Sequence, residues 1–259
     1  MLRISRKNEI KSIAFKDGNV IVAQLAEQFN TSEETIRKDL KQLEDEGVLK
    51  RVYGGAIYID STKREDAETR EKLFIEDKEI IADICMPYIK NNESIFLDGS
   101  TTAYCLAKKL QDKQITVITN SLLISNLFST SASVVTLVTI GGQYDSKRKV
   151  FLGQTSELCL KQYFFDKAFI SCEALHLDHG LTDSSEAHAQ IRKLAISQAH
   201  DAFLIVDHTK FDKSSLAYIT KPNSLHALIT NKPLSQKWTA KLDSINVAYD
   251  FPKPVKKQS

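Results

Sequence analysis

Cysteine, long apolar runs and enzyme signatures are all scarce in this chain of 259 residues, and each absence excludes a class of protein. The four cysteines stand far apart without a C-x-x-C pair, which excludes a zinc site or a disulfide framework and leaves them as small core residues. No apolar run approaches the roughly 20 residues that cross a bilayer, and the first residues lack the apolar segment of a secretory signal. We expect a cytoplasmic protein without a membrane partner, a metal or a cofactor.

The chain also contains no nucleophile elbow, no phosphate-binding P-loop and no dinucleotide-binding fingerprint. Neither sign of charge is in clear excess. The formal net charge is +2, and residues 1–57 carry ten Lys and Arg against nine Asp and Glu. A strongly basic field therefore cannot drive nucleic-acid binding, and any such binding must depend on where the cations lie.

A capped amphipathic helix, in residues 31–47, is the clearest motif that is present. Thr31 and Glu34 have the spacing of a capping box, and Ser32 is an equally good cap. At about 100° per residue, one face of this helix is apolar and the other is polar enough to enter a DNA groove. The apolar face carries Ile36, Leu40 and Leu43, and the polar face carries Glu34, Lys38 and Lys41, flanked by Thr35, Arg37 and Gln42.

Two shorter helices are predicted before this one, and a basic hairpin after it. Helical spacing is shared by Val22, Leu25, Ala26 and Phe29 and, further upstream, by Ile10, Ile13 and Ala14. Gly47 ends the helix, residues 48–53 favour a strand, and Gly54-Gly55 supplies a turn. This order predicts a winged helix-turn-helix whose three helices share one small core.

The predicted DNA contacts lie on the polar helix face and in the wing. Arg37 and Lys38 are placed to meet base edges or phosphates, and a bidentate Arg contact to guanine discriminates by about 1–3 kcal/mol. The other cations are expected at phosphates, which position a protein without specifying sequence. Any one of these charges could be merely solvated, but the assembled unit favours double-stranded DNA. The full predicted set is Ser32, Thr35, Arg37, Lys38, Lys41, Lys50, Arg51, Tyr53 and Gly54.

Residues 60–72 separate this unit from the rest of the chain, because nine of their side chains are charged and Ala67 is the only apolar one. We expect no core contact from this segment, although its i, i+4 charge spacing would suit a helix. The predicted domains are a DNA-binding domain at 1–58, a charged linker at 59–74, an α/β effector domain at 75–250 and a flexible tail at 251–259.

From residue 75 onward, apolar strand-like runs alternate with amphipathic helical stretches. Continuous apolar runs separated by helices predict a mostly parallel sheet covered on both faces, with ligands at the carboxyl ends of its strands. The strand candidates are 95–97, 115–118, 134–140, 168–170, 202–206, 227–229 and 245–248.

Three of these strands run into small polar residues or glycine. Residues 98–102 (Asp-Gly-Ser-Thr-Thr) open a helix, where amides and hydroxyls can converge on an anion. Thr119-Asn120 and Gly141-Gly142 follow the next two strands. Each motif alone is more often structural, but their placement at successive strand ends favours a rim for a phosphorylated polyol.

Both halves of the chain resemble the DeoR family of bacterial transcription regulators. The matching segments are 35–40, Leu43-Glu44, Gly47 and 51–56 in the first half, and 98–102, Thr119-Asn120, Gly141-Gly142, Gly153, 180–182 and 207–211 in the second. The resemblance implies a winged helix-turn-helix and an α/β domain of the ribose-5-phosphate isomerase type that binds a sugar phosphate. It implies phosphate contacts from Ser100, Thr101 and Thr102, hydroxyl contacts from Asp98 and Asn120, and a carbonyl or phosphate contact from Lys210. The complete predicted effector set is Asp98, Gly99, Ser100, Thr101, Thr102, Thr119, Asn120, Gly141, Gly142, Glu186 and Lys210, with Glu186 the weaker candidate.

The chain departs from the family pattern at three positions. Lys38 stands where the family usually has a second Arg, and the two differ in hydrogen-bonding geometry. Tyr53 stands where the family often has His. After the 168–170 strand the family often has Gly, whereas Glu173 here can narrow the pocket or change its charge.

The histidines do not predict a metal site. His176 and His179 are expected to point to opposite faces of a strand or loop, and His188 is expected to diverge from Glu186 on a helix. No tetrahedral ligand set emerges from these spacings.

The leading hypothesis is a repressor of a sugar catabolic operon, which releases operator DNA when a phosphorylated sugar binds. Helix-turn-helix proteins usually read paired half-sites, so we expect a homodimer or homotetramer. The alternative is a sugar-phosphate isomerase-type enzyme with an N-terminal adaptor domain, using Asp98, Glu186 and Lys210 as base and electrophile. An RNA- or protein-binding winged helix is disfavoured, because Tyr53 is the only stacking aromatic near the recognition face.

Overall fold

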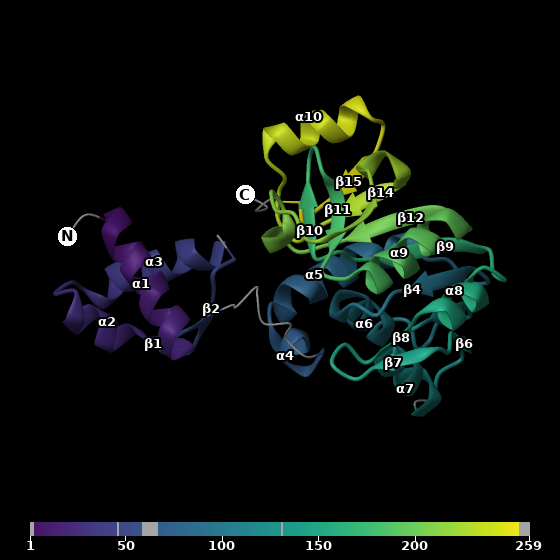
Figure 1. The fold of residues 1–259 in the computed structure, drawn as a ribbon, viewed down its shortest axis with the longest axis horizontal. Helices are drawn as coiled ribbons and strands as arrows, with labels where there is room; N and C mark the ends of the chain where they lie inside the picture. The colour runs from purple at the N-terminus through teal and green to yellow at the C-terminus, as the bar shows by residue number, and fades with distance from the viewer. Residues whose placement is uncertain (1–2, 46, 59–66, 131, 254–259) are drawn as a thin grey trace, which may run out of the picture. The chain divides into compact units, whose positions relative to one another are not determined.

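The computed structural model describes residues 3–45, 47–58, 67–130 and 132–253. The chain divides into two compact units between Glu65 and Asp66 (Figure 1). Residues 59–66 of the predicted linker and 254–259 of the predicted tail lie outside the described residues. None of the helices that the structure describes is long and apolar enough to cross a bilayer.

The first unit is the winged helix-turn-helix that the sequence predicts. Its helices are α1 (Arg3–Asp17), α2 (Val22–Gln28) and α3 (Glu33–Asp45), and its strands are β1 (Asn19–Ile21), β2 (Leu49–Val52) and β3 (Gly55–Tyr58). The strands form an antiparallel sheet in the order β1-β3-β2. The three helices share one core, which includes Ile10, Ala14, Leu25, Ile36, Leu40 and Leu43.

Local sequence determines where the helices of this unit begin and end. Ser32 is the cap of α3, because its Oγ accepts a hydrogen bond from the Thr35 N–H at 3.3 Å. Gly18 follows α1 with φ +78°, and Asn30 lies between α2 and α3 with φ +47°. Both residues belong to the types that adopt the left-handed conformation most readily, so each chain reversal occurs where the sequence permits it.

Two glycines shape the wing. The β2–β3 hairpin closes through a two-residue turn, Tyr53-Gly54, in which Gly54 has φ +81°. Gly55 approaches β1 so closely that a Cβ on it would lie 2.1 Å from the carbonyl oxygen of Val20. The Gly-Gly pair is therefore required by a left-handed turn at the first position and by a close backbone approach at the second.

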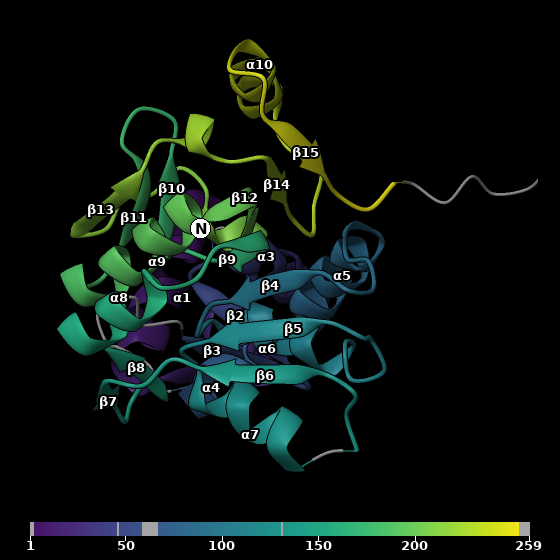
Figure 2. The same ribbon diagram turned by 90° about the vertical axis from the view of Figure 1, so that its right-hand side faces the viewer.

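The second unit is built on a seven-stranded sheet in which every neighbouring pair is parallel, in the order β15-β14-β12-β9-β4-β5-β6 (Figure 2). The predicted α/β class is confirmed. The last strand begins only at Ala248, because Ile245 still caps the preceding helix. The strands are β4 (Ser94–Leu97), β5 (Thr116–Thr119), β6 (Thr136–Thr139), β9 (Phe165–Ile170), β12 (Ala199–Ile205), β14 (Ala227–Ile229) and β15 (Ala248–Asp250).

Helices cover both faces of this sheet, so successive residues of one strand enter different cores. Ile95 and Leu97 pack with α5 (Ile75–Cys85), α6 (Thr101–Lys108) and α7 (Leu122–Thr130). Phe96 packs in the other core, with α8 (Gln154–Leu160), α9 (Glu186–Gln198) and α10 (Gln236–Ser244). Short 3-10 helices span Met86–Tyr88, His208–Lys210 and Pro222–Ser224. The four cysteines are free thiols, three of them buried.

Two small antiparallel sheets were not predicted. One is the hairpin of β7 (Gln143–Asp145) and β8 (Val150–Leu152), and the other joins β10 (Ala174–His176), β11 (Gly180–Asp183) and β13 (Ala217–Thr220) in the order β10-β11-β13. Strands of three or four residues are too short to show a clear hydrophobic period. These sheets contribute side chains to the site described below.

The predicted charged linker extends too far into the second unit. Residues 67–72 form the short helix α4 (Ala67–Lys72), which lies against α6. Ala67 is buried and its N–H donates to the carbonyl of Lys147, while Lys78 Nζ donates to the carbonyls of Arg70 and Leu73. The expectation that this segment makes no core contact is wrong, because its single apolar side chain and its backbone provide the contacts.

Candidate DNA-binding and effector sites

The two cations predicted to meet base edges lie on the solvent face of α3. The side chains of Arg37 and Lys38 are 58% and 69% exposed. Arg37 Nη2 lies 2.5 Å from Glu33 Oε2, and Lys38 Nζ lies 2.8 Å from Glu34 Oε1. Helix pairs of this kind contribute only about 0.3–0.5 kcal/mol. Both cations can therefore leave their carboxylate partners and contact DNA with little loss of free energy.

The wing cations share one carboxylate at the end of α3. Arg51 Nε lies 2.7 Å from Glu44 Oε2, and Lys50 Nζ lies 3.8 Å from Glu44 Oε1. These pairs join the wing to the recognition helix, and Tyr53 at the tip of the wing is fully exposed. Of the remaining predicted contacts, Ser32, Lys41 and Gly54 are exposed and Thr35 is half-buried.

Asp39 was not among the predicted functional residues, although it lies inside the 35–40 motif. It is buried, and its Oδ2 accepts a hydrogen bond from Arg6 Nε at 2.6 Å. This ion pair joins α1 to α3. An acidic residue beside the apolar stripe, next to Leu40, was the one available signal.

In the second unit, the loops that follow β4 and β5 and the end of β11 border a small hollow that is partly open to solvent. The hairpin β7–β8 and the helices α4 and α9 complete it. Positive charge dominates its wall, which contains three arginines against two aspartates. The lining residues are Arg70, Asp98, Gly99, Asn120, Arg148, Val150, Leu152, Asp183, His188, Ile191 and Arg192.

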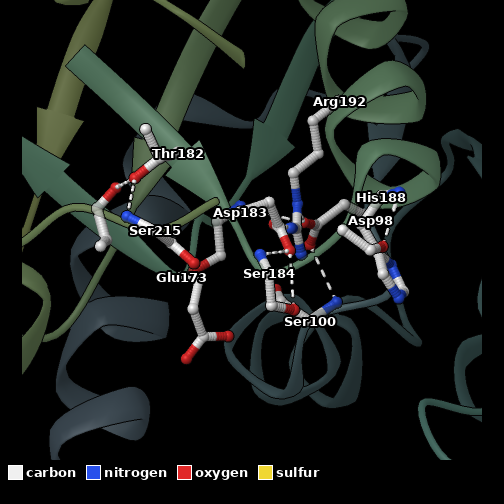
Figure 3. A network of polar contacts seen from close by, with 12 residues as sticks. Asp98, Ser100, Glu173, Thr182, Asp183, Ser184, His188, Arg192 and Ser215 are labelled. Atoms are coloured by element: carbon white, nitrogen blue, oxygen red, sulfur yellow. Dashed lines mark hydrogen bonds and ion pairs between the residues drawn. The ribbon is translucent and has the colours of Figure 1, made fainter. Parts of the chain in front are cut away.

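Arg192 extends from α9 to two carboxylates, Asp98 and Asp183, that also line the hollow (Figure 3). Its Nε lies 2.8 Å from Asp98 Oδ2, and its Nη1 contacts Asp183. Asp98 also accepts hydrogen bonds of 3.0 Å from the backbone N–H groups of Ser100 and Ser171. Burial raises the pKa of Asp98, but Arg192 and these hydrogen bonds outweigh burial and hold the pKa below its ordinary value. The Asp98 carboxylate is therefore bound by groups of the protein itself, and these contacts position the loop after β4.

Two further guanidinium groups line the hollow. Arg148 Nη2, from the β7–β8 turn, lies 3.6 Å from Glu173 Oε2 and 3.3 Å from Ser184 Oγ. Arg70, from α4, has no carboxylate within 4.0 Å among the described residues. Burial and then the charge of Arg148 lower the pKa of Arg70 to about 10. Three guanidinium groups around one hollow, one of them without a carboxylate within 4.0 Å among the described residues, suit a phosphate dianion.

Glu173 changes the charge beside the hollow, as the departure from the family pattern suggested. Its carboxylate lies 3.6 Å from both Arg148 and Lys210 Nζ. The charge of Lys210, followed by those of nearby arginines, outweighs burial and lowers the pKa of Glu173 to about 2. Glu173 is therefore ionised at neutral pH and partly neutralises two cations.

Asn120 lines the hollow and carries a buried acceptor without a partner among the described residues. Its Nδ2 donates to the carbonyl of Phe151 at 3.0 Å, but its buried Oδ1 has no hydrogen-bond partner among the described residues. Gly99 lets the Val150 side chain lie against the loop beside this oxygen, because a Cβ on Gly99 would lie 2.0 Å from Val150 Cγ1 and 3.8 Å from Asn120 Oδ1. A ligand hydroxyl could donate to Asn120 Oδ1 and satisfy it.

Of the eleven predicted effector residues, Asp98, Gly99 and Asn120 line the hollow. Two of the others serve the fold: Ser100 Oγ caps α6 by accepting from the Ala103 N–H, and Thr119 Oγ1 donates to the Leu97 carbonyl. The remainder do not line it either: Thr101 and Thr102 are buried, Lys210 is half-buried, and Gly141, Gly142 and Glu186 are exposed.

The three arginines were missed because each stood in a segment with another interpretation. Arg70 lay in the predicted linker, and Arg148 lies between two lysines in what reads as a solvated turn. Arg192 alone gave a signal, since it interrupts an apolar helix stripe between Ala189 and Ala195, all of them buried.

The expectation that His176 and His179 point to opposite faces is wrong. Their rings stack with centroids 4.4 Å apart and an interplanar angle of 22°, because the chain turns between β10 and β11. His188 lines the hollow, where its Nε2 lies 3.4 Å from Asp145 Oδ2. Burial and then Arg148 lower the pKa of His188, which favours the neutral imidazole. Within the described part of the chain, no group of three or more His, Cys, Asp and Glu could hold a metal ion.

Comparison with known families identifies the family of this chain. Residues 6–62 match the DeoR-like helix-turn-helix domain, and residues 74–232 match the DeoR C terminal sensor domain. The chain belongs to the DeoR family. It is thus a DNA-binding transcriptional regulator in which a sensor domain follows the helix-turn-helix.

Several known transcriptional regulators are similar to this chain over nearly its whole length. The HTH-type transcriptional regulator IolR of Bacillus subtilis (strain 168) is 31% identical to this chain. The match covers 92% of this chain and 95% of IolR. The L-fucose operon activator of Haemophilus influenzae is 30% identical, with 90% and 94% covered. The lactose phosphotransferase system repressor of Staphylococcus epidermidis is 29% identical, with 92% and 96% covered. Among solved structures, ribose 5-phosphate isomerase from Plasmodium falciparum matches 52% of each chain, with 15% identity and a TM-score of 0.38.

Proposed function

We propose that this DeoR-family protein represses a sugar catabolic operon, and that a phosphorylated sugar bound in the hollow of the second unit weakens its hold on operator DNA. One observation supports this most: Arg70, Arg148 and Arg192 come from three separate elements and line one hollow. Relatives named for a lactose phosphotransferase system and an L-fucose operon support a sugar-linked role.

In the proposed complex, the arginines hold the phosphate and Asn120 holds the sugar. Guanidinium groups offer paired N–H donors that match phosphate oxygens, and their hydrogen bonds to an anion are short and strong. Asn120 Oδ1 accepts from a sugar hydroxyl, and neutral His188 is available as a second polar contact. A sugar phosphate engages both ends of the site, whereas phosphate alone leaves the Asn120 oxygen unpaired.

The proposed DNA surface is the exposed face of α3 together with the wing. Arg37 and Lys38 contact base edges or phosphates, while Lys41, Lys50 and Arg51 contact phosphates. Ser32, Thr35, Tyr53 and Gly54 border these cations. We further propose a cytoplasmic homodimer or homotetramer, since paired heads read paired half-sites.

We also propose that the protein does not turn over its sugar phosphate. An isomerase needs a base and an electrophile positioned at one carbonyl. Asp98 is held by Arg192, Glu186 is exposed, and Lys210 lies beside Glu173 without lining the hollow. The three residues that the enzyme hypothesis requires are therefore not available together.

The DNA half of the proposal is tested with an Arg37→Ala variant and a library of genomic fragments. The variant should lose selective retention of the fragments that the wild type retains over scrambled duplex, while its unfolding free energy stays within about 0.5 kcal/mol. Lys90→Ala, which removes one exposed cation from the second unit, is the matched control and should change neither property. A large stability loss in Arg37→Ala would show that Arg37 is structural.

The effector half is tested with ribose 5-phosphate, glucose 6-phosphate, fructose 1-phosphate and the corresponding free sugars. At least one phosphorylated sugar should raise the melting temperature by mass action and release the retained DNA, and no free sugar should do so. Coupling between two such sites is typically about 1–3 kcal/mol. Steady product formation from the active compound would favour the enzyme instead.

A further inference from the structure

We propose that Arg70 couples the bound phosphate to the chain that leads to the DNA-binding unit. The inference rests on the proposed function, because it assigns the regulation of the same hollow. α4 is the first described element of the second unit and begins at Ala67, directly after the boundary between the units. A change in how α4 is held is therefore a change at the point where the sensor joins the preceding chain.

Few contacts hold α4 in place. It has six residues, and a helix this short is not stable without tertiary contacts. Its anchors are the buried Ala67 side chain, a hydrogen bond from the Ala67 N–H to the Lys147 carbonyl, and hydrogen bonds from Lys78 Nζ to the carbonyls at its C-terminal end. Two surface ion pairs add to these, Glu71 with Lys108 at 3.0 Å and Glu68 with Lys149 at 3.7 Å. Exposed pairs of this kind contribute little. The position of α4 therefore responds to any interaction that Arg70 gains or loses.

Arg70 differs from the other two arginines of the hollow in its ion-pair partners. Arg192 is held by Asp98 and Asp183, and Arg148 by Glu173 and Ser184. Arg70 lies near the positive charges of both and has no carboxylate within 4.0 Å in the part of the chain that is described. Without a bound anion, the more distant carboxylates of Glu173 and Asp98 offset only part of the cost of burying Arg70 and of its repulsion by the other two guanidinium groups, so this side chain adds little to the attachment of α4.

A bound phosphate changes this balance. Its oxygens accept hydrogen bonds from all three guanidinium groups, and the anion then draws Arg70, with α4, toward residues that are already fixed. The phosphate binds the attached arrangement of α4 better than the detached one, which is the condition for a ligand to shift an equilibrium. Arg148 and Arg192 supply affinity, whereas Arg70 supplies both affinity and coupling.

The test measures amide hydrogen exchange and DNA retention of the full chain in inorganic phosphate, against chloride at equal ionic strength. In the wild type, saturating phosphate should slow exchange in residues 67–73 and in residues 99–103 by about tenfold, and should reduce retention of the selected DNA fragments. Arg70→Ala should keep the protection of 99–103 but lose both the protection of 67–73 and the effect on DNA. Arg148→Ala should need more phosphate and then reach the wild-type responses. Arg70→Lys, which keeps the charge but not the paired donors, should restore part of the α4 response.

Three results would overturn the inference while leaving the proposed site in place. In the first, phosphate protects 99–103 but not 67–73 in the wild type. In the second, Arg70→Ala keeps the protection of 67–73. In the third, α4 is protected but DNA retention is unchanged by phosphate. Failure of phosphate to protect either segment would instead contradict the proposed function itself.

Discussion

Replacement of Arg192 by alanine should destabilise the second unit strongly. Among the described residues, Arg192 is the only ion-pair partner within 4.0 Å of two carboxylates that are almost inaccessible to solvent: Asp98 is 1% exposed and Asp183 is 2% exposed. Removing one member of a buried pair costs about 3–5 kcal/mol, because the remaining charge stays desolvated. A domain of ordinary stability has about 5–15 kcal/mol in total, so most of the margin would be lost.

The loss of unfolding free energy in Arg192→Ala should depend on pH, in a direction set by the pKa of Asp98. In the wild type its pKa is lowered, so its contribution to stability is present above the unfolded pKa, about 3.9, and is lost as pH falls through the folded pKa. In Arg192→Ala, the largest interaction that opposes burial is lost, and the pKa of Asp98 should rise. The neutral form is then favoured in the folded state, so the difference between variant and wild type should shrink as pH falls from 7 toward 4.

Urea unfolding followed by Trp238 fluorescence is the appropriate assay. Trp238 is the only tryptophan, and it is buried in one core of the second unit, so its signal reports that unit alone. Arg148→Ala is the matched control from the same hollow. Its partner Glu173 is 31% exposed at 3.6 Å, so this variant should lose about 1 kcal/mol or less. Equal losses in the two variants, or a loss in Arg192→Ala that does not change with pH, would refute the reasoning.

Three further substitutions test other parts of the structure. Asp39→Asn should weaken the buried contact with Arg6, lower the stability of the first unit by about 1–3 kcal/mol and speed amide exchange in α3; unchanged exchange would show that this ion pair does not position the helix. Glu173→Gln should leave two cations without their carboxylate and tighten inorganic phosphate binding by up to about tenfold in calorimetry, whereas weaker binding would contradict the charge argument. Gly99→Ala should place a Cβ 2.0 Å from a Val150 side-chain carbon and abolish phosphate-induced stabilisation while DNA retention persists; a normal thermal shift would mean that the ligand does not enter beside Gly99.

The DNA-binding unit could be predicted almost completely from the sequence. Its helices are marked by local features, such as the Ser32 cap and the 3.6-residue apolar period, and its wing by two adjacent glycines. These features depend on neighbours within a few residues along the chain. The Arg6–Asp39 pair was missed because it joins two helices 33 positions apart.

The effector site shows the opposite balance. The apolar runs predicted a parallel sheet, and the small residues at strand ends predicted a polar rim, of which Asp98, Gly99 and Asn120 line the hollow. The residues that define its charge were not found, because Arg70, Arg148 and Arg192 read locally as linker, turn and helix.

Local periodicity and turn chemistry thus determined the elements and the class of fold. Only the tertiary structure decided which charges share one hollow, because that depends on strand order and on the hairpin and helix that close over the sheet. Burial then changes the chemistry of those charges: a guanidinium or carboxylate that is merely solvated in an isolated segment must find a partner of opposite charge once water is excluded.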